Sequence, residues 1–469
     1  MSKISKISAR PILDSSGSKT IEVTVKTDCG HKGVASVPQG KSKGSGEVPY
    51  VSVLKALKNI KITERFLKGI DVTDQKKIDD LLLTEGRGLS SLRRSNLPKL
   101  KRNSSFLGGN VTVGVSMAVA RAAAASQKVE LWEYLHKLYV SRHPERSEGS
   151  SKNSSVKLQN DNKNMRLLIN CIEGGAHAKN GPAFQEYLIS PKIKSVICHP
   201  GSRSKRLFGI QNIKESIKIG EQFYKALKKY IKKTYGIAKL GDEGGFTLPT
   251  IKRSEFPGKS DLDFTQNIKP LEILKEVART AKLSKHLDFG LDVAANNVKL
   301  TNKQLKKLYA EIIAEFPLFY LEDPFAEKRW EKMSFVISTE AEGGVEKSHQ
   351  CPNKANEISR QARDDSGLYV IADDLTTTNP DKIKKAHQKN LANGVIIKPN
   401  QIGTITQALE AVSLARQYGW FVCVSHRGRE TKDSFIADFA YAIGADAVKF
   451  GGFGQAERRA KYKRLLKIS

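Results

Sequence analysis

Short apolar runs, each ending on a charged or titratable residue, recur in the second two-thirds of the chain. The runs are rich in β-branched and aromatic residues and are mostly separated by segments of helix length, which is the pattern of buried parallel strands. Their last residues are Asp292, Glu322, Asp373, Lys398, His426 and Lys449. Because residues at the C-terminal ends of barrel strands face the active site, we expect these side chains to converge at one mouth.

The spacing of these strand ends fits one strand, one helix and two short loops per repeat. The step from Asp292 to Glu322 is 30 residues, and the last three steps, which start at Asp373, are 25, 28 and 23 residues. The intervening step of 51 residues is too long for one repeat. Its excess lies in a polar segment at residues 340–367, which we predict to be an insert.

The first part of the chain has a different pattern. Residues 21–28 begin with alternating apolar and polar side chains, as in a half-exposed strand, and a hairpin turn is predicted at residues 29–33. Helical periodicity follows over residues 50–69 and 112–138. We therefore predict that residues 1–140 form a small α+β domain that caps the barrel.

A segment with almost no apolar side chains separates the two patterns. Residues 141–164 are predicted to be a polar insert or linker, which places the barrel domain at residues 165–469. Two further segments, at about residues 87–103 and 198–209, are basic and are predicted to be surface inserts.

Composition narrows the class of protein. A chain of 469 residues, 39% of them hydrophobic, can bury a sizeable core in two domains. Its five cysteines are odd in number, scattered and without a CxxC pair, which argues against a disulfide framework or structural zinc and favours a cytoplasmic protein. No run of about 18 apolar residues exists and the N-terminus lacks a long apolar stretch, so neither a membrane span nor a signal peptide is expected.

The net charge of +30 raises the hypothesis of binding to nucleic acid or another anionic surface. The alternative is a lysine-rich solvated surface. No zinc-finger spacing or RNP-type aromatic motif accompanies the charge, and part of it falls in the predicted insert at 87–103. A positive field would also favour a small anionic substrate.

Three acids at the ends of successive predicted strands, Asp292, Glu322 and Asp373, form a candidate metal site. Three carboxylates in a small space need a positive partner, and Mg²⁺ prefers near-octahedral oxygen ligands. The alternative is that each acid pairs with a lysine or caps the next helix. Their shared register on successive strands favours the metal.

Lys398 is the candidate general base. A lysine at the end of a buried strand loses its proton more easily when burial and a nearby cation, here Lys449, lower its pKa. The alternative is that Lys398 only neutralises the acids.

Glycine-rich and basic loops supply further candidates. Glu243 lies among glycines in GDEGGF and could serve as an acid or base, because glycine lets the backbone approach a ligand closely. His177 lies in a second glycine-rich loop, and Arg427 in SHRGRET is a candidate clamp for phosphate or carboxylate.

Longer segments combine these residues in a specific order: GDEGGF, LEDPF, ADDLTTTNP, IIKPNQIGTITQALEA and VSHRGRET. From about residue 9 to the C-terminus, apart from the inserts, the chain resembles the enolase family. The resemblance implies an α/β fold with a ββαα(βα)₆ TIM-like barrel and a smaller N-terminal α+β domain. It also implies a Mg²⁺-dependent lyase that interconverts 2-phosphoglycerate and phosphoenolpyruvate plus water.

The resemblance also implies a role for each candidate residue. Lys398 matches the base that takes the α-proton, and Glu243 matches the acid that assists departure of the 3-hydroxyl. The implied metal ligands are Asp292, Glu322, Asp373 and the loop residue Ser42. The implied substrate-binding residues are His177, Gln185, Glu186, Glu322, Asp373, His426, Arg427, Gly428 and Lys449. The implied assembly is a homodimer in which Arg10 meets Glu457 of the partner subunit.

Several positions depart from the family pattern. The loop PQGKSKG, residues 38–44, stands where PSGASTG is common, and Gly428 follows Arg427 where a serine is usual. Phe450 stands where a small polar residue is usual. We expect altered affinity rather than loss of chemistry. Two alternative functions are another lyase or racemase of the enolase superfamily and an RNA-binding protein that uses its basic surface.

Overall fold

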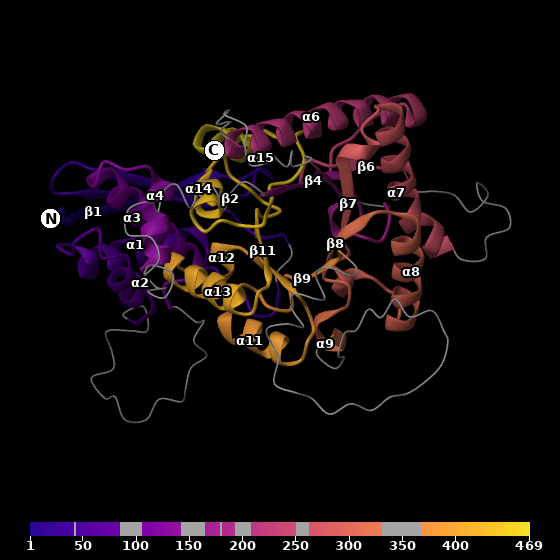
Figure 1. Ribbon diagram of the computed structural model, residues 1–469. Helices are drawn as coiled ribbons and strands as arrows, with labels where there is room; N and C mark the ends of the chain where they lie inside the picture. Colours follow the sequence, from indigo (N-terminus) through magenta and orange to yellow (C-terminus); the bar gives the residue numbers. More distant parts are fainter. Residues whose placement is uncertain are drawn as a thin grey trace, which may run out of the picture.

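The structure is a computed structural model that describes residues 1–41, 44–84, 106–141, 165–178, 181–192, 208–249, 262–330 and 367–469. Ser42 and nearly all of the four segments predicted to be inserts lie outside the described residues. Figure 1 shows the N-terminal domain, in indigo and purple, beside the barrel, whose later strands are orange and yellow.

The N-terminal domain is built on a three-stranded antiparallel sheet made of β1 (Ile4–Leu13), β2 (Lys19–Thr27) and β3 (Lys32–Ser36). Ile21, Val23 and Val25 of β2 are fully buried, and their alternation along the strand is the pattern predicted for residues 21–28. The described helices of this domain are α1 (Val53–Leu67), α2 (Gln75–Thr84), α3 (Gly109–Ser126) and α4 (Leu131–Val140).

Helix α3 packs closely on this sheet because both surfaces carry small residues. A Cβ atom on Gly33 of β3 would lie 1.9 Å from the carbonyl oxygen of Ala118 in α3, so only glycine fits there. The Ala-rich stretch of α3 is almost entirely buried. This packing fixes the end of β3, from which the loop that carries Lys41 and Glu47 runs to the barrel.

The larger domain is a closed barrel of eight strands in the described part of the chain. Strand β12 pairs with β4 to close it, and β5 runs antiparallel to its two neighbours while all other pairs are parallel. A short ninth strand, β6 (Phe246–Thr247), adds to β4. The barrel strands are β4 (Arg166–Glu173), β5 (Glu186–Pro191), β7 (Leu287–Asp292), β8 (Leu318–Glu322), β9 (Tyr369–Ala372), β10 (Gly394–Ile397), β11 (Phe421–Ser425) and β12 (Ala447–Lys449).

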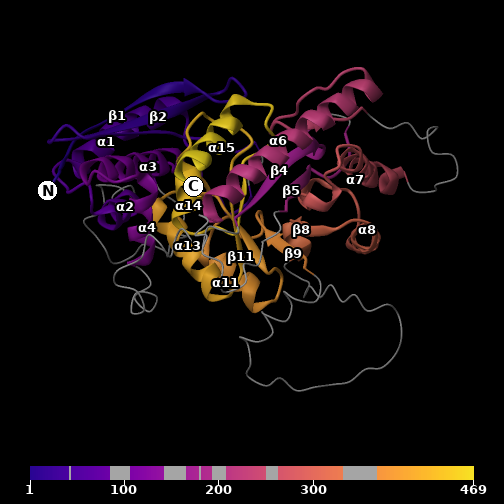
Figure 2. The same cartoon turned by 45° about the horizontal axis from the view of Figure 1, so that its top comes forward.

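Helices surround this barrel in the order that the family resemblance predicts. Two helices separate β5 from β7, and each later strand is followed by at least one described helix, so the ββαα(βα)₆ fold is confirmed (Figure 2). These helices are α6 (Phe208–Tyr235), α7 (Leu262–Thr280), α8 (Asn302–Glu315), α9 (Glu327–Trp330), α11 (Pro380–Gln388), α12 (Pro399–Ile402), α13 (Ile405–Gln417), α14 (Phe435–Ala442) and α15 (Ala456–Ile468). Short 3₁₀ turns lie at η4 (Gly175–His177), η6 (Ser284–His286) and η7 (Ala295–Asn297). Of the described helices, none combines the length and the apolar character needed to span a membrane.

The two domains are joined by buried polar contacts. Arg121 of α3 makes a two-pronged ion pair with Asp433, with both nitrogen–oxygen distances at 2.7 Å. The carboxylate of Asp79 in α2 accepts a hydrogen bond of 2.9 Å from the backbone N–H of Thr406 in α13. The N-terminal domain is therefore held against the part of the barrel that carries β10 to β12.

Candidate active site

The strand-end residues converge as the sequence pattern predicts. Asp292, Glu322 and Lys449 are the last residues of β7, β8 and β12, and Asp373, Lys398 and His426 directly follow β9, β10 and β11. A pocket lies at these ends, and its empty space, including the open solvent at its mouth, is about 500 Å³. Ten of the predicted site residues line it: Gln185, Glu186, Glu243, Asp292, Asp373, Lys398, His426, Arg427, Gly428 and Lys449.

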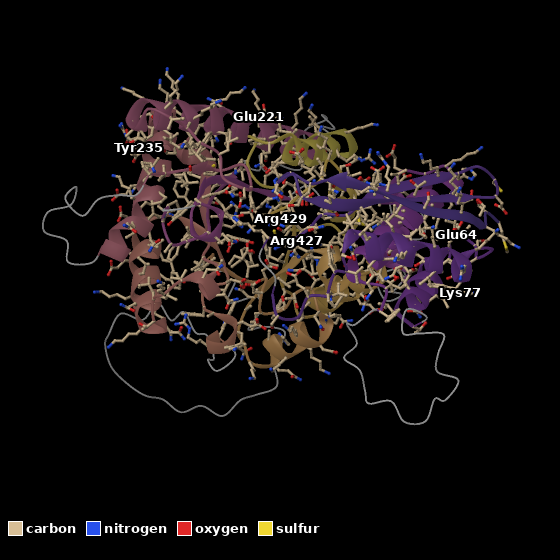
Figure 3. The ribbon with its side chains drawn as sticks, turned by 180° about the vertical axis from the view of Figure 1, so that it is seen from behind. Glu64, Lys77, Glu221, Tyr235, Arg427 and Arg429 are labelled. Atoms are coloured by element: carbon tan, nitrogen blue, oxygen red, sulfur yellow. The ribbon has the colours of Figure 1, made fainter. Side chains whose placement is uncertain are left out.

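The other three predicted site residues are placed differently. Glu322 and His177 do not line the pocket but contact residues that do, and Ser42 lies outside the described residues. The pocket also has lining residues that the sequence did not single out: Lys41, Glu47, Ala294, Asn297, Asp323, Asp374, Gln401 and Ser425. Figure 3 shows Arg427 near the middle of the molecule, between the N-terminal domain, marked by Glu64, and helix α6, marked by Glu221.

Lys449 contacts three buried carboxylates. Its Nζ lies 2.8 Å from Asp292 Oδ2, 2.7 Å from Glu322 Oε2 and 2.9 Å from Glu186 Oε2. Burial alone would lower the pKa of this lysine, but Asp292, Glu186 and Glu322 raise it well above its usual value. These three acids thus meet at one positive charge, and for Asp292 and Glu322 this is the pairing with a lysine that the sequence left open as the alternative to a metal.

Glu322 is strongly affected by this crowding. Burial, together with the neighbouring Asp292, raises the pKa of Glu322 to about 8, even though Lys449 opposes the shift. The hydroxyl of Tyr320 donates a hydrogen bond of 2.6 Å to the Glu322 carboxylate. A further cation at this position would stabilise the ionised form of Glu322.

Lys398 is paired with Asp373. Its Nζ lies 2.5 Å from Asp373 Oδ2, and the amide of Gln401 donates a hydrogen bond of 3.0 Å to Asp373 Oδ1. Burial lowers the pKa of Lys398, but Asp373 outweighs burial and raises it. The lowered pKa expected from burial and from Lys449 is therefore wrong for this arrangement, because an opposite charge in direct contact dominates.

The acidic residues at this edge of the barrel suit a hard cation. Among the described residues, carboxylate oxygens of Asp323, Asp373 and Asp374 lie within 4.8 Å of one another. Burial and the charge of Asp373 raise the pKa of Asp374 to about 6, which is a sign of crowded negative charge. Together with Asp292, which also lines the pocket, they form an all-oxygen donor set, which fits Mg²⁺ better than a thiophilic metal.

Glu243 is held by two histidines on the other side of the pocket. Its Oε2 lies 3.0 Å from His426 Nε2, and its Oε1 lies 3.7 Å from His177 Nε2. Burial would raise the pKa of Glu243, but His426 and then His177 lower it well below its usual value. The neighbouring Glu186 behaves in the opposite way, because burial raises its pKa well above the usual value despite Lys449.

His426 presents one defined tautomer to Glu243. Burial, with Arg458 and Lys449 nearby, lowers the pKa of His426 to about 3, although Glu243 opposes the shift. An arginine only donates, and Arg458 contacts His426 Nδ1, so Nδ1 is the acceptor. The proton of the neutral ring therefore lies on Nε2 and faces the Glu243 carboxylate.

Two buried residues that the sequence reading missed hold these loops in place. Glu173, at the end of β4, accepts backbone N–H bonds from Glu243 at 3.0 Å and Gly245 at 2.6 Å. Arg458 of α15 donates to the backbone carbonyl oxygens of Asp242 and Gly428 at 3.1 and 2.8 Å. The glutamate in EGGAH and the arginines in ERRAKYKR were visible signals, but nothing in the sequence linked either to the distant loop.

Arg427 is already paired across the domain boundary. Its Nη2 donates to Glu47 Oε1 and Oε2 at 3.0 and 2.9 Å, and both side chains are buried. Phe450, in contrast, packs in the core against Tyr462 with ring centroids 5.6 Å apart. The unusual phenylalanine therefore does not line the pocket.

Comparisons with known proteins match both domains of the chain to one family. The family model described as "Enolase, N-terminal domain" matches residues 4–135, and "Enolase, C-terminal TIM barrel domain" matches residues 166–345 and 354–469. A protein named "Enolase" from Helicobacter pylori strain J99 is 30% identical over 496 residues, which cover 100% of this chain and 96% of that protein. "Enolase B" from Dictyostelium discoideum is 34% identical over 493 residues, covering 99% of this chain and 94% of the relative.

Proposed function

We propose that Lys398 is the general base and Glu243 the general acid of this chain, which belongs to the enolase family and is a phosphopyruvate hydratase. The enzyme interconverts 2-phosphoglycerate and phosphoenolpyruvate plus water. The observation that supports this assignment is the shared pocket, which brings a strand-end lysine and a loop glutamate to the same cluster of buried acids.

Asp292, Glu322 and Asp373 are the residues that would hold magnesium. When bound, the ion would neutralise the substrate carboxylate and the negative charge that develops on it as the α-proton leaves. The raised pKa of Glu322 supports this role, because a buried acid that resists ionisation gains from a cation beside it.

Lys398, with its amine in the neutral form, removes the α-proton of 2-phosphoglycerate. Asp373 is the cause of its raised pKa, so any other positive partner that Asp373 gains makes Lys398 easier to deprotonate. The amide of Gln401 keeps the Asp373 carboxylate oriented through its hydrogen bond. The backbone N–H of Lys398 donates a hydrogen bond of 2.9 Å to Thr378 Oγ1, which fixes the position of the lysine.

Glu243 completes the reaction at the neighbouring carbon. In dehydration its carboxyl group gives a proton to the departing 3-hydroxyl, which leaves as water; in hydration the carboxylate takes a proton from the attacking water. The proton can be shared with Glu186, since the raised pKa of Glu186 and the lowered pKa of Glu243 describe a carboxyl pair that holds one proton.

The remaining polar and charged groups would hold the substrate. Arg427, the backbone N–H of Gly428 and His426 would bind the phosphate side, and Lys449 the carboxylate side. The homodimer stays a prediction: Arg10 is 71% exposed and pairs with Glu22 of its own chain. The cytoplasmic location and the binding of nucleic acid also stay predictions.

The test is turnover by the purified chain. We expect 2-phosphoglycerate to be converted to phosphoenolpyruvate, followed by absorbance of the enol product, with activity lost on chelation and restored by Mg²⁺. A panel of other carboxylic acids that carry a proton on the α-carbon distinguishes this activity from that of other lyases and racemases of the superfamily. Absence of turnover in folded protein with excess Mg²⁺ would overturn the assignment.

A further inference from the structure

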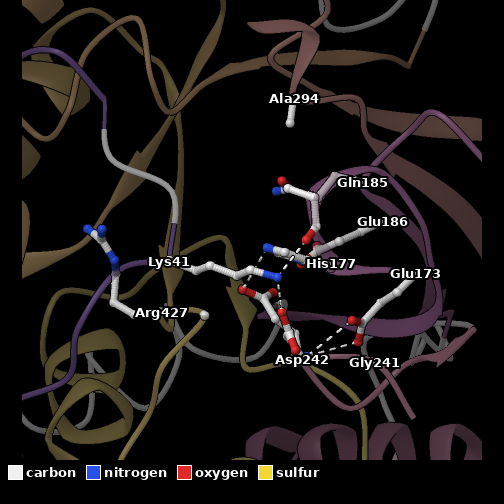
Figure 4. A network of polar contacts seen from close by, with 12 residues as sticks. Lys41, Glu173, His177, Gln185, Glu186, Gly241, Asp242, Ala294 and Arg427 are labelled. Atoms are coloured by element: carbon white, nitrogen blue, oxygen red, sulfur yellow. Dashed lines mark hydrogen bonds and ion pairs between the residues drawn. The ribbon is translucent and has the colours of Figure 1, made fainter. Parts of the chain in front are cut away.

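Lys41 connects three loops at the mouth of the pocket. It lies in the loop that follows β3, and its Nζ donates a hydrogen bond of 2.6 Å to the carbonyl oxygen of Ala176, beside His177. The same ammonium pairs with the carboxylate of Asp242, beside Glu243. Figure 4 shows the side chain of Lys41 stretched across the space between Arg427 and this group of loop residues.

The Cβ atom of Lys41 lies beside the position where residue 428 carries no side chain. A Cβ atom on Gly428 would lie 3.1 Å from Lys41 Cβ and 3.2 Å from Glu243 Oε1. The backbone of Gly428 does not have a positive φ, so its conformation does not demand glycine. The glycine therefore leaves open a small space that the Cβ atom of Lys41 and the Glu243 carboxylate border, so the two positions that depart from the family pattern are neighbours.

Lys41 is also the most accessible cation of the pocket. Its side chain is 34% exposed and that of Asp242 is 43% exposed, whereas the Arg427 and Glu47 side chains are 4% and 8% exposed. An ion pair at the surface contributes little and exchanges partners readily, while a buried pair is costly to separate. The Lys41 ammonium can thus leave Asp242 for a stronger anion.

We propose that Lys41 is a substrate-binding residue, whose ammonium exchanges Asp242 for the phosphate group of the substrate next to the backbone N–H of Gly428. This inference rests on the proposed function, in which that N–H and Arg427 bind the phosphate. Glu47 is paired with Arg427 and offsets part of its positive charge. The Lys41 ammonium therefore adds to the net positive charge that a phosphate dianion meets. A charge-assisted bond to phosphate is stronger than a neutral one.

The first experiment measures binding apart from turnover. In the full chain we expect Lys41→Ala to raise the KM for 2-phosphoglycerate about tenfold with kcat within about twofold, the effect of losing one charge-assisted hydrogen bond. In a Lys398→Ala background, calorimetric titration with 2-phosphoglycerate in Mg²⁺ should show the same loss in Kd. Lys269→Ala is the matched control, since Lys269 and its partner Glu272 are 32% and 41% exposed and lie on α7.

The second experiment uses the contact with Gly428. Gly428→Ser alone should raise KM, because its Cβ meets the Cβ of Lys41 and the Glu243 carboxylate. Lys41→Ala would keep the first of these contacts, whereas Lys41→Gly/Gly428→Ser removes it and should recover most of the affinity that Lys41→Gly loses. Unchanged KM and Kd in Lys41→Ala, or a fall in kcat alone, would overturn the inference and leave Lys41 as a structural link between loops. A Lys41→Gly/Gly428→Ser double variant that binds no better than Lys41→Gly would also count against it. An inactive wild-type chain would instead refute the proposed function.

Discussion

The two sides of the pocket are held together in different ways. On the strand side, Lys449 and Lys398 are in direct contact with the acids that neutralise them. On the loop side, Glu243 is positioned by a backbone that Glu173 and Arg458 hold through buried hydrogen bonds. The strand side therefore depends on direct attraction between lysines and acids, and the loop side on satisfied hydrogen-bond donors and acceptors.

This difference decides what a substitution does on each side. On the strand side, removing one lysine leaves the acids that it contacts as uncompensated buried charges. Removing an acceptor from the loop support leaves specific N–H groups unpaired and lets Glu243 shift. The four substitutions below, ordered by expected effect, separate the two kinds of support.

Lys398→Ala should have the largest effect on turnover. Loss of a general base lowers the rate by about 10²–10⁴-fold, and exchange of the α-proton with solvent, followed by NMR, should disappear with it. Substrate should still bind in the presence of Mg²⁺, because the other binding groups remain. Exchange that persists in the variant would show that another group is the base.

Lys449→Met should have the largest effect on stability. It leaves Asp292, Glu322 and Glu186 buried without their shared cation, a loss of about 3–5 kcal/mol in the free energy of unfolding. Urea denaturation at neutral pH measures it, and added Mg²⁺ should recover part of the loss. A variant as stable as the Lys269→Ala control would mean that the strand side does not depend on this charge.

Glu173→Ala should lower both stability and kcat through the loop. The N–H groups of Glu243 and Gly245 lose their acceptor, at a cost of about 2 kcal/mol. Glu173→Gln keeps an acceptor oxygen and should retain more of the kcat. Equal kcat in the two variants would argue that Glu173 does not position Glu243.

The same glutamate predicts a pH dependence. Burial and Glu243 raise the pKa of Glu173 from 4.5 to about 8, so between these values the folded state binds more protons than the unfolded state. Stability contributed by this group therefore falls as pH rises from 5 to 8. Urea denaturation at both values should show a smaller fall for Glu173→Gln than for the wild type.

Thr378→Val should have the smallest effect of the four. The Thr378 hydroxyl accepts from the backbone N–H of Lys398 and donates to Gln401 at 2.7 Å, so its loss leaves these partners unsatisfied. We expect about 1 kcal/mol of lost stability and a modest fall in kcat without a change in KM. A larger loss than that of Glu173→Ala would reverse the comparison of the two sides.

The strand side was the easier one to predict from sequence. Asp292, Glu322, Asp373, Lys398, His426 and Lys449 repeat with the period of the fold, and the ends of parallel strands meet at one edge. Their pairing was harder to foresee, because the direct contact of Lys398 with Asp373 depends on side-chain direction rather than on spacing. The raised pKa of Lys398 follows from that contact.

The loop side carries no such period. Glu243 stood out only through its glycines and through the resemblance to a family. Glu173 and Arg458 lie 70 residues before and 215 residues after it in the sequence, and their importance comes from burial and from backbone partners. A pattern of hydrophobic positions does not encode such contacts.

The interface between the two domains affects how the enzyme loses activity on heating. Glu47 and Lys41 reach the pocket from the small domain, which the Arg121–Asp433 pair holds in place. Separation of the domains would withdraw both residues while the barrel itself remained folded. Thermal inactivation should therefore precede the main unfolding transition. The residual activity at each temperature then reports whether the N-terminal domain is still packed against the barrel.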